Sequence, residues 1–223
     1  DVDRVGSYFG LRKLGVEKPA GLGHPYVSLN GKPVYLQMAL DQSWNPDGYW
    51  TWPTDDAMRE EVLIARRLGL NTLRTHVKVE VPRKLYWADR LGVLVMADVP
   101  NSWGEPDEAM RQEWETALRG MVRRDFNHPS VFSWVLFNEQ WGLQTKGADG
   151  KASWLPETQE WVGRGYDLAK ALDEMIAVAP QSDHCPDCGC STSPGCWPGR
   201  HAVAPSLRSV PPSSRFALRT RAT

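Results

Sequence analysis

The first 174 residues contain no cysteine, and the chain as a whole lacks an excess of charge of either sign. Its 26 Lys and Arg residues stand against 27 Asp and Glu residues, which gives a formal net charge of -1. This balance provides no basic surface for nucleic acid or for an anionic membrane. No apolar run approaches the roughly 20 residues of a membrane span. The sequence therefore predicts neither nucleic acid nor a membrane as a partner.

The N-terminus lacks the features of an exported or newly initiated chain. Asp1–Arg4 includes no initiator Met, and neither a basic n-region nor an apolar h-region follows. We therefore expect the chain to be an internal segment of a longer gene product.

Beyond residue 174 the sequence lacks Lys, Glu, Tyr and Asn, although Lys and Glu are plentiful upstream. Residues 175–223 hold seven Pro, seven Ser and five Arg in 49 positions, without a sustained apolar period. Such a composition predicts an irregular or disordered tail. The abrupt change near residue 174 also leads to the hypothesis that the tail is translated out of frame after a frameshift.

All four cysteines lie in this tail, at Cys185, Cys188, Cys190 and Cys196, with His184 beside the first. Clustered thiolates can hold zinc in a closed tetrahedral site. However, zinc sites usually have two separated pairs of ligands, whereas here three cysteines fall within six residues. We therefore favour an unstructured tail over a zinc knuckle, and predict neither a metal site nor a cofactor.

Four strand–helix units follow one another between residues 30 and 172. Short apolar runs typical of buried parallel strands occur at residues 34–40, 71–76, 93–97 and 131–137. Amphipathic segments follow these runs, and their helices are predicted to begin after Thr54, at Pro82, after Pro106 and after Pro156. This alternation predicts an α/β fold with a parallel sheet and right-handed crossovers.

Two architectures fit the alternation: a doubly wound open sheet and a (β/α)8 barrel. No GxGxxG turn follows any of the strands, which weakens the dinucleotide-binding version of the open sheet. A complete barrel needs about 250 residues, so four units would form only its first half. The carboxyl ends of barrel strands form the active face. Polar residues gather at these ends: Asp41, Arg74, His76, Asp98, Asn138 and Glu139.

The fourth strand ends in Asn138 and Glu139, close to Trp141. A Glu in an aromatic, partly desolvated mouth has its charged form disfavoured, so it can keep a proton and act as a general acid on a leaving oxygen. Asn138 could bind a sugar hydroxyl, and Trp44, Trp103 and Trp141 could stack on a sugar ring.

Structural roles compete with these assignments. Glu139 could be a salt-bridged carboxylate, and the exposed indoles could simply close the top of the barrel. Arg74 or His76 could pair with Asp98 and orient the mouth without touching substrate. Asp41 and Asp98 fit structural roles better than direct contact with a substrate.

The stretch Asn127-His128-Pro129-Ser130-Val131 that leads to Asn138-Glu139 resembles the catalytic-domain signature of glycoside hydrolase family 2, the β-galactosidase and β-glucuronidase group. Residues 68–76 and 86–96 resemble the second strand, second helix and third strand of its barrel. The resemblance implies three parts: the end of an immunoglobulin-like β-sandwich domain with a linker (1–28), the first half of a TIM barrel (29–174) and the tail (175–223).

Carried over residue by residue, the resemblance makes Glu139 the acid/base and Asn138 the contact to the sugar 2-hydroxyl, while Arg74 and His76 line the site. We add Trp141, Trp103 and Asp41 as further substrate contacts. Residues 38–42 read Met-Ala-Leu-Asp-Gln where galactosidases of the family carry Gly-Val-Asn-Arg-His. A galactose or glucuronic acid specificity therefore does not transfer.

The family hydrolyses β-glycosides with retention, which requires a second carboxylate about 5–5.5 Å from the first as nucleophile. In the family this carboxylate follows the seventh strand, beyond the part of the chain that matches. The resemblance thus implies a carbohydrate-binding fragment that has the acid/base but lacks the nucleophile. The alternative is a non-catalytic truncated half-barrel that binds sugar weakly or has no activity.

Overall fold

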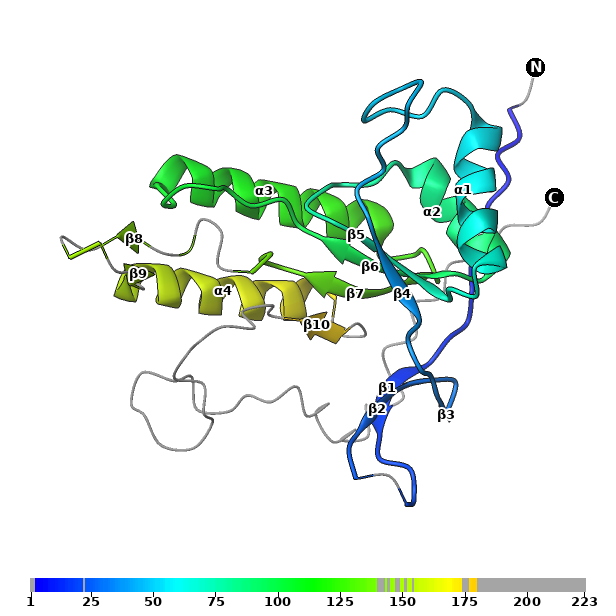
Figure 1. Cartoon of the computed structure of the whole chain (residues 1–223), viewed down its shortest axis with the longest axis horizontal. Helices are drawn as coiled ribbons and strands as arrows, with labels where there is room; N and C mark the ends of the chain where they lie inside the picture. Colours follow the sequence, from blue (N-terminus) through cyan, green and yellow to red (C-terminus); the bar gives the residue numbers. More distant parts are fainter. Residues whose placement is uncertain are drawn as a thin grey trace.

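The computed structural model of the chain describes residues 3–21, 23–139, 143, 145–146, 149–150, 152–153, 155–173 and 177–179 (Figure 1). The cysteine cluster and most of the predicted tail lie outside these residues. Within them, no helix is both long and apolar enough to cross a membrane. The same part of the chain holds no group of three or more His, Cys, Asp or Glu side chains that could bind a metal ion.

A five-stranded parallel sheet forms the centre of the fold, in the order β10-β7-β6-β5-β4. Its strands are β4 (Met38–Asp41), β5 (Thr72–Thr75), β6 (Leu94–Asp98), β7 (Val131–Val135) and β10 (Ala177–Ala179). Because sequential strands are neighbours and run in parallel, the four predicted strand–helix units are confirmed as an α/β fold.

The helices begin and end where local sequence signals place them. They are α1 (Asp55–Arg67), α2 (Pro82–Leu91), α3 (Glu108–Asp125) and α4 (Pro156–Leu172). The Thr54 side chain caps α1 by accepting from the Ala57 N–H at 3.1 Å. Gly92 ends α2 at a φ of 69°, which costs glycine little. In Figure 1, α1 lies against α2 and α3 against α4.

Two strand predictions differ from the structure. The first strand begins at Met38 rather than Val34, because the Val34 N–H bonds to the Val27 carbonyl and the Asn71 side chain binds Tyr35 and Gln37. The second difference is β10, which pairs with β7 although it lies within residues 175–223. Ala177–Ala179 therefore continue the parallel pattern beyond residue 174.

The larger hydrophobic core lies between α3, α4 and the β6–β7 part of the sheet. Trp114, Trp134 and Trp161 are buried there. The Trp114 ring stacks on Phe137 at a centroid distance of 4.7 Å, and its N–H donates to the Leu136 carbonyl at 3.0 Å. The indole of Trp114 thereby joins α3 to the carboxyl end of β7. A smaller cluster joins α1 to β5.

Two small sheets flank the central one. The first is antiparallel and contains β1 (Leu14–Glu17), β2 (Tyr26–Leu29) and β3 (Lys32–Pro33). The second is a hairpin of β8 (Thr145–Lys146) and β9 (Ala152–Ser153).

The segment before β1 binds the amino end of β7 (Figure 1). The Tyr8 hydroxyl donates to Asp89 at 2.5 Å, and Arg12 Nη2 donates to the Val131 carbonyl at 2.6 Å. Between them Gly10 lies so close to Pro129 that an added Cβ would be 2.5 Å from the Pro129 Cβ, which explains the glycine. The residues on either side of Gly10, Phe9 and Leu11, are 81% and 89% exposed.

Candidate active site

Arg74, Asp98 and Asn138 meet at the carboxyl edge of the parallel sheet. They come from three neighbouring strands: Arg74 lies on β5, Asp98 ends β6, and Asn138 follows β7. Arg74 Nε donates to Asp98 Oδ1 at 2.9 Å, and Nη2 donates to Asp98 Oδ2 at 2.8 Å. The same Nη2 donates to Asn138 Oδ1 at 2.8 Å. The three predicted end-of-strand residues therefore form one hydrogen-bonded unit.

Asp98 is the buried anchor of this unit, with 0% of its surface exposed. Burial raises the pKa of its carboxyl, and the Arg74 guanidinium opposes that shift. The Val77 N–H also donates to Asp98 Oδ2, at 3.1 Å. Val77 has a φ of 52°, a costly backbone conformation for a β-branched residue, which is held here by the bond to Asp98. The bidentate pair fixes the Arg74 guanidinium in position.

Asn138 is buried and its amide orientation follows from Arg74. Because Arg74 can only donate, the amide oxygen of Asn138 must face it, and the Nδ2 group lies on the other branch of the amide. The Asn138 N–H donates to the Asn101 side-chain oxygen at 3.3 Å. The group that Asn138 can offer a ligand is therefore a hydrogen-bond donor, which suits a hydroxyl oxygen.

Glu139 follows Asn138 with a φ of 54°. Left-handed backbone is uncommon for residues other than glycine, and such strained positions cluster at functional sites. The Glu139 side chain is exposed, so the described residues do not provide the desolvated surroundings that the sequence predicts. Trp141, the predicted aromatic neighbour of Glu139, lies outside the described residues.

His76 lies beyond β5 and is bound by Gln42 rather than by the Arg74 unit. The Trp44 indole can only donate, and its Nε1 donates to Gln42 Oε1 at 3.2 Å. The Gln42 amide nitrogen therefore faces His76 Nδ1, at 2.8 Å, and donates to it. In this arrangement Nδ1 is an acceptor, so the neutral ring carries its proton on Nε2.

Asp41 lies in a buried ionic cluster that separates it from the Arg74 unit. Its carboxylate contacts the ammonium of Lys84, whose Nζ also lies 2.5 Å from Glu61 Oε2 and 3.3 Å from Glu80 Oε2. Burial lowers the pKa of Lys84, but the three carboxylates outweigh it and the pKa is raised. Burial raises the pKa of Glu61. The Ser43 hydroxyl donates to Glu80 and accepts from Lys84.

Sequence reasoning missed Lys84 and Glu80. A signal for Lys84 existed, because Lys84, Ala88 and Leu91 share the i, i+4, i+7 face of α2. That face is buried, and a buried lysine ammonium needs a carboxylate beside it as a counter-charge.

The last predicted contact, Trp103, lies in the loop after β6. Its side chain is exposed, and the loop begins at the carboxyl end of β6, which is Asp98. The site predictions thus fall into separate groups, of which the Arg74–Asp98–Asn138 unit is the most tightly joined.

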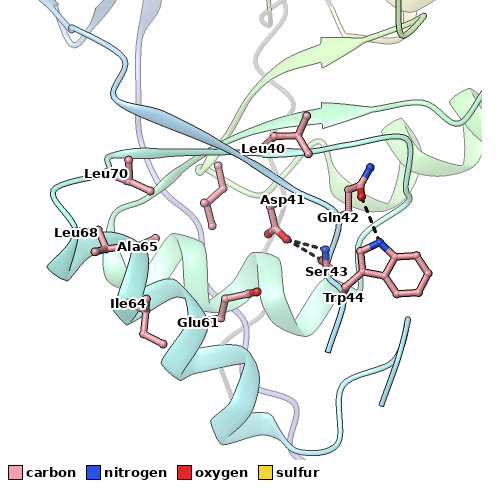
Figure 2. Close-up of a pocket in the computed structure, with 11 residues that line it drawn as sticks. Leu40, Asp41, Gln42, Ser43, Trp44, Glu61, Ile64, Ala65, Leu68 and Leu70 are labelled. Carbon is pink, nitrogen blue, oxygen red and sulfur yellow. Dashed lines mark hydrogen bonds between the residues drawn. The ribbon is translucent and has the colours of Figure 1, made fainter. Parts of the chain in front are cut away.

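A groove of about 390 Å³ lies between β4 and α1, outside this unit. Figure 2 shows Ile64, Leu68 and Leu70 at one end of the groove and Gln42, Ser43 and Trp44 at the other, with Asp41 and Glu61 between them. None of the residues that line it belongs to the Arg74–Asp98–Asn138 unit.

Comparison with known proteins gives a family for the chain. Residues 25–179 match the family model described as "Glycosyl hydrolases family 2, TIM barrel domain". The β-galactosidase of Thermoanaerobacterium thermosulfurigenes is 31% identical over 139 residues, which are 61% of this chain and 18% of that protein. The β-glucuronidase of Mus musculus is 31% identical over 140 residues, or 58% of this chain and 20% of that protein. The chain therefore spans about a fifth of the length of these curated relatives.

Solved structures agree on the fold. A β-glucuronidase of Parabacteroides merdae superposes with a TM-score of 0.65 at 22% identity, over 76% of this chain and 21% of that one. β-Glucuronidase 3 of Bacteroides uniformis gives a TM-score of 0.62 at 26% identity, with the same coverage of both chains. Because the family model matches more than half of the chain, this chain belongs to glycosyl hydrolase family 2 and carries part of the TIM barrel domain of that family.

Proposed function

We propose that this chain is the part of a retaining β-glycosidase that holds the acid/base, Glu139, and the contact to the sugar 2-hydroxyl, Asn138. The observation that carries the proposal is the Arg74–Asp98–Asn138 unit at the carboxyl edge of the sheet, with Glu139 directly after it. A fixed amide donor beside an exposed carboxyl group provides both the orientation of a sugar ring and a proton for its leaving oxygen.

The reaction would proceed in two displacements. Glu139 transfers its proton to the glycosidic oxygen while the bond from that oxygen to the anomeric carbon breaks. A second carboxylate attacks the opposite face of the anomeric carbon, and water later releases the sugar with Glu139 as the base. This second carboxylate would come from the part of the whole protein that this chain does not include. Asn138 Nδ2 donates to the sugar 2-hydroxyl, a contact that strengthens as the transition state forms.

The proposed substrate is a β-glycoside. Two structural neighbours support a carbohydrate ligand: the β-glucuronidase of Bifidobacterium dentium was solved with coumarin-3-O-glucuronide, and that of Ruminococcus gnavus with D-glucuronic acid. Arg74, His76, Trp103, Trp141 and Asp41 stay proposed contacts. Of these, Arg74 would act by orienting Asn138, and Asp41 through the Lys84 cluster.

The same proposal divides the chain at residues 28 and 174. The antiparallel β1–β3 sheet does not join the parallel sheet, which supports a separate origin for the N-terminal part, although this sheet runs from Leu14 to Pro33 and so extends past residue 28. The end of an immunoglobulin-like domain would lie in residues 1–28, and the first half of the barrel in 29–174.

A non-catalytic half-barrel is the second candidate. The observation in its favour is that three carboxylates considered as replacements for the nucleophile are poorly placed for that role. Asp98 is fully buried against Arg74, while Glu157 and Glu160 lie exposed on the first turns of α4. None of these three described carboxylates is a suitable nucleophile, which supports a chain that does not form a glycosyl–enzyme on its own.

The test replaces the missing carboxylate with azide. Incubating the purified chain with 4-methylumbelliferyl β-glycosides and sodium azide should give the α-glycosyl azide, because azide attacks the anomeric carbon while Glu139 protonates the aryl oxygen. Galactoside, glucoside and glucuronide substrates should each be tried. We expect product only with azide, and a loss of about 100-fold or more in Glu139→Gln.

Glu160→Gln is the matched control, since Glu160 is an exposed carboxylate on α4 and should not change the rate. Failure to form any glycosyl azide, or formation at the same rate in Glu139→Gln, would favour the non-catalytic half-barrel.

A further inference from the structure

Three exposed aromatic side chains gather in the loop between β4 and α1. Trp44 is 58% exposed, Tyr49 76% and Trp50 48%. The Trp44 and Trp50 rings meet edge to face with centroids 5.1 Å apart. Aromatic rings carry large apolar surfaces that are usually buried, and grouped exposure of this kind marks a binding surface. We call these three residues the aromatic platform.

The loop that carries the aromatic platform is held by its own hydrogen bonds. Asn45 and Tyr49 exchange backbone hydrogen bonds of 2.8 and 2.7 Å, and the Thr51 N–H donates to the Gly48 carbonyl at 2.8 Å. Lys78 Nζ donates to the Trp50 carbonyl at 3.2 Å. Because the backbone is fixed before a ligand arrives, binding to these rings needs little ordering of the loop.

Gln42 connects the platform to the proposed active site. Its side-chain oxygen accepts from the Trp44 indole, and its amide nitrogen donates to His76. The position of the Trp44 ring is therefore coupled to a side chain that the family resemblance places in the site. The platform also follows the carboxyl end of β4, at the same edge of the sheet as Asn138.

The position of the platform determines which part of a substrate it could hold. The loop that carries the platform follows β4, whereas Asn138 follows β7, three strands away in the same sheet. A reacting ring that lies against Asn138 would therefore leave the platform to another ring of the same substrate.

We propose that Trp44, Tyr49 and Trp50 form a subsite that stacks a second ring of the substrate. The proposal rests on the proposed function, because Asn138 must hold the first ring. The chemistry required is a flat face that packs against an indole, which both an aryl group and a second pyranose provide.

The test compares one-ring and two-ring ligands on the full chain. Methyl, phenyl and glucosyl β-glycosides of galactose, glucose and glucuronic acid are titrated by calorimetry. In parallel, ¹⁹F spectra of the 5-fluorotryptophan-labelled protein report on each indole. For at least one sugar, we expect phenyl or disaccharide ligands to bind on the order of 3- to 10-fold more tightly than the methyl glycoside. The Trp44 resonance should shift with two-ring ligands only.

Trp44→Ala should abolish this preference, while Trp44→Phe, which keeps a ring, should retain most of it. Tyr35→Ala is the matched control, because Tyr35 is 73% exposed and lies before β4, whereas the platform follows it. A preference for phenyl ligands alone would identify an aryl group as the second ring, and a preference for disaccharides alone would identify a pyranose.

The outcomes separate the two proposals. Equal affinity for one-ring and two-ring ligands, or a preference that survives Trp44→Ala, would overturn the subsite and leave the proposed function standing. Absence of binding by every glycoside would overturn both.

Discussion

Arg74 Nη2 donates to two acceptors at once, Asp98 Oδ2 at 2.8 Å and Asn138 Oδ1 at 2.8 Å. The buried Asp98 carboxylate fixes this nitrogen, and the nitrogen in turn fixes the Asn138 amide that is proposed to bind the sugar. The orientation of Asn138 consequently depends on Asp98, a residue that it does not contact in any of the hydrogen bonds described above.

Replacing Asp98 by Asn should destabilise the chain by about 3 kcal/mol, since the nearly buried Arg74 guanidinium would lose its counter-charge. Urea unfolding followed by circular dichroism measures this loss. The double variant Arg74→Met/Asp98→Leu should recover part of it, because matched apolar groups leave no unpaired charge. A loss below about 1 kcal/mol in Asp98→Asn would mean that the pair contributes little.

Lys84 is predicted to be the most sensitive position of the ionic cluster. Its side chain is 3% exposed, and its ammonium contacts the carboxylates of Asp41, Glu61 and Glu80. Lys84→Met keeps the volume but removes that ammonium from the carboxylates, so the free energy of unfolding should fall by about 3–5 kcal/mol. Lys32→Met, at an exposed position, should change stability by no more than about 0.5 kcal/mol in the same assay. Equal effects of the two substitutions would contradict the prediction.

Asp89 should make stability depend on pH in the acid range. Burial raises the pKa of its carboxyl, but hydrogen bonds from His128, Ser130 and Tyr8 outweigh burial, so the pKa lies below the ordinary 3.8. The folded state therefore binds this proton less readily than the unfolded state, and the stabilisation is present above pH 3.8 and is lost as the pH falls through the lower pKa.

Asp89→Asn should cost about 2 kcal/mol at pH 7, and the difference from the wild type should shrink below pH 3.8. Unfolding curves at pH 7, 5, 4 and 3 measure it, with the exposed Asp3→Asn as control. A difference that stays constant from pH 7 to pH 3 would rule out this linkage.

Two helical glycines should respond to alanine in opposite directions. A Cβ at Gly165 of α4 would lie 2.6 Å from Trp114 Cη2 inside the core, whereas a Cβ at Gly120 of α3 would meet nothing within 4 Å. Gly165→Ala should therefore destabilise by about 1–3 kcal/mol, and Gly120→Ala should stabilise by about 0.5–1 kcal/mol. Thermal unfolding of both variants checks the signs. If both variants were more stable than the wild type, the Trp114 ring would be able to move aside without a cost in free energy.

Periodicity and capping residues suffice to predict the succession of strands and helices. Thr54, Pro82 and Gly92 act through neighbours within a few residues, so their effects are visible in the sequence. The start of β4 is different, because it is set by the Asn71 side chain, which binds backbone atoms 34 and 36 positions away. Long-range contacts of this kind leave no local signal.

The candidate site divides in the same way. Asn138 and Glu139 stand out because they end a buried strand that carries a specific motif, and Arg74 and Asp98 because they end neighbouring strands. A sequence pattern indicates on which face of a helix or strand a residue lies, but it does not indicate which side chain that residue contacts. The pairing of Asp41 with Lys84 therefore became apparent only in the structure, where α2 packs against the end of β4.

The side chains before β1 alternate in phase, with Tyr8, Gly10 and Arg12 towards the barrel and Phe9 and Leu11 towards solvent. Consider a residue inserted after Gly10 while Arg12 keeps its place. Each residue before the insertion would then move by one position, so that side chains facing the domain and side chains facing solvent would exchange places. Phe9 would then take the place of Tyr8 beside the Asp89 carboxylate, and the inserted side chain would press on Pro129. The spacing of Tyr8, Gly10 and Arg12 therefore matters more than the composition of the segment for its attachment to the rest of the domain.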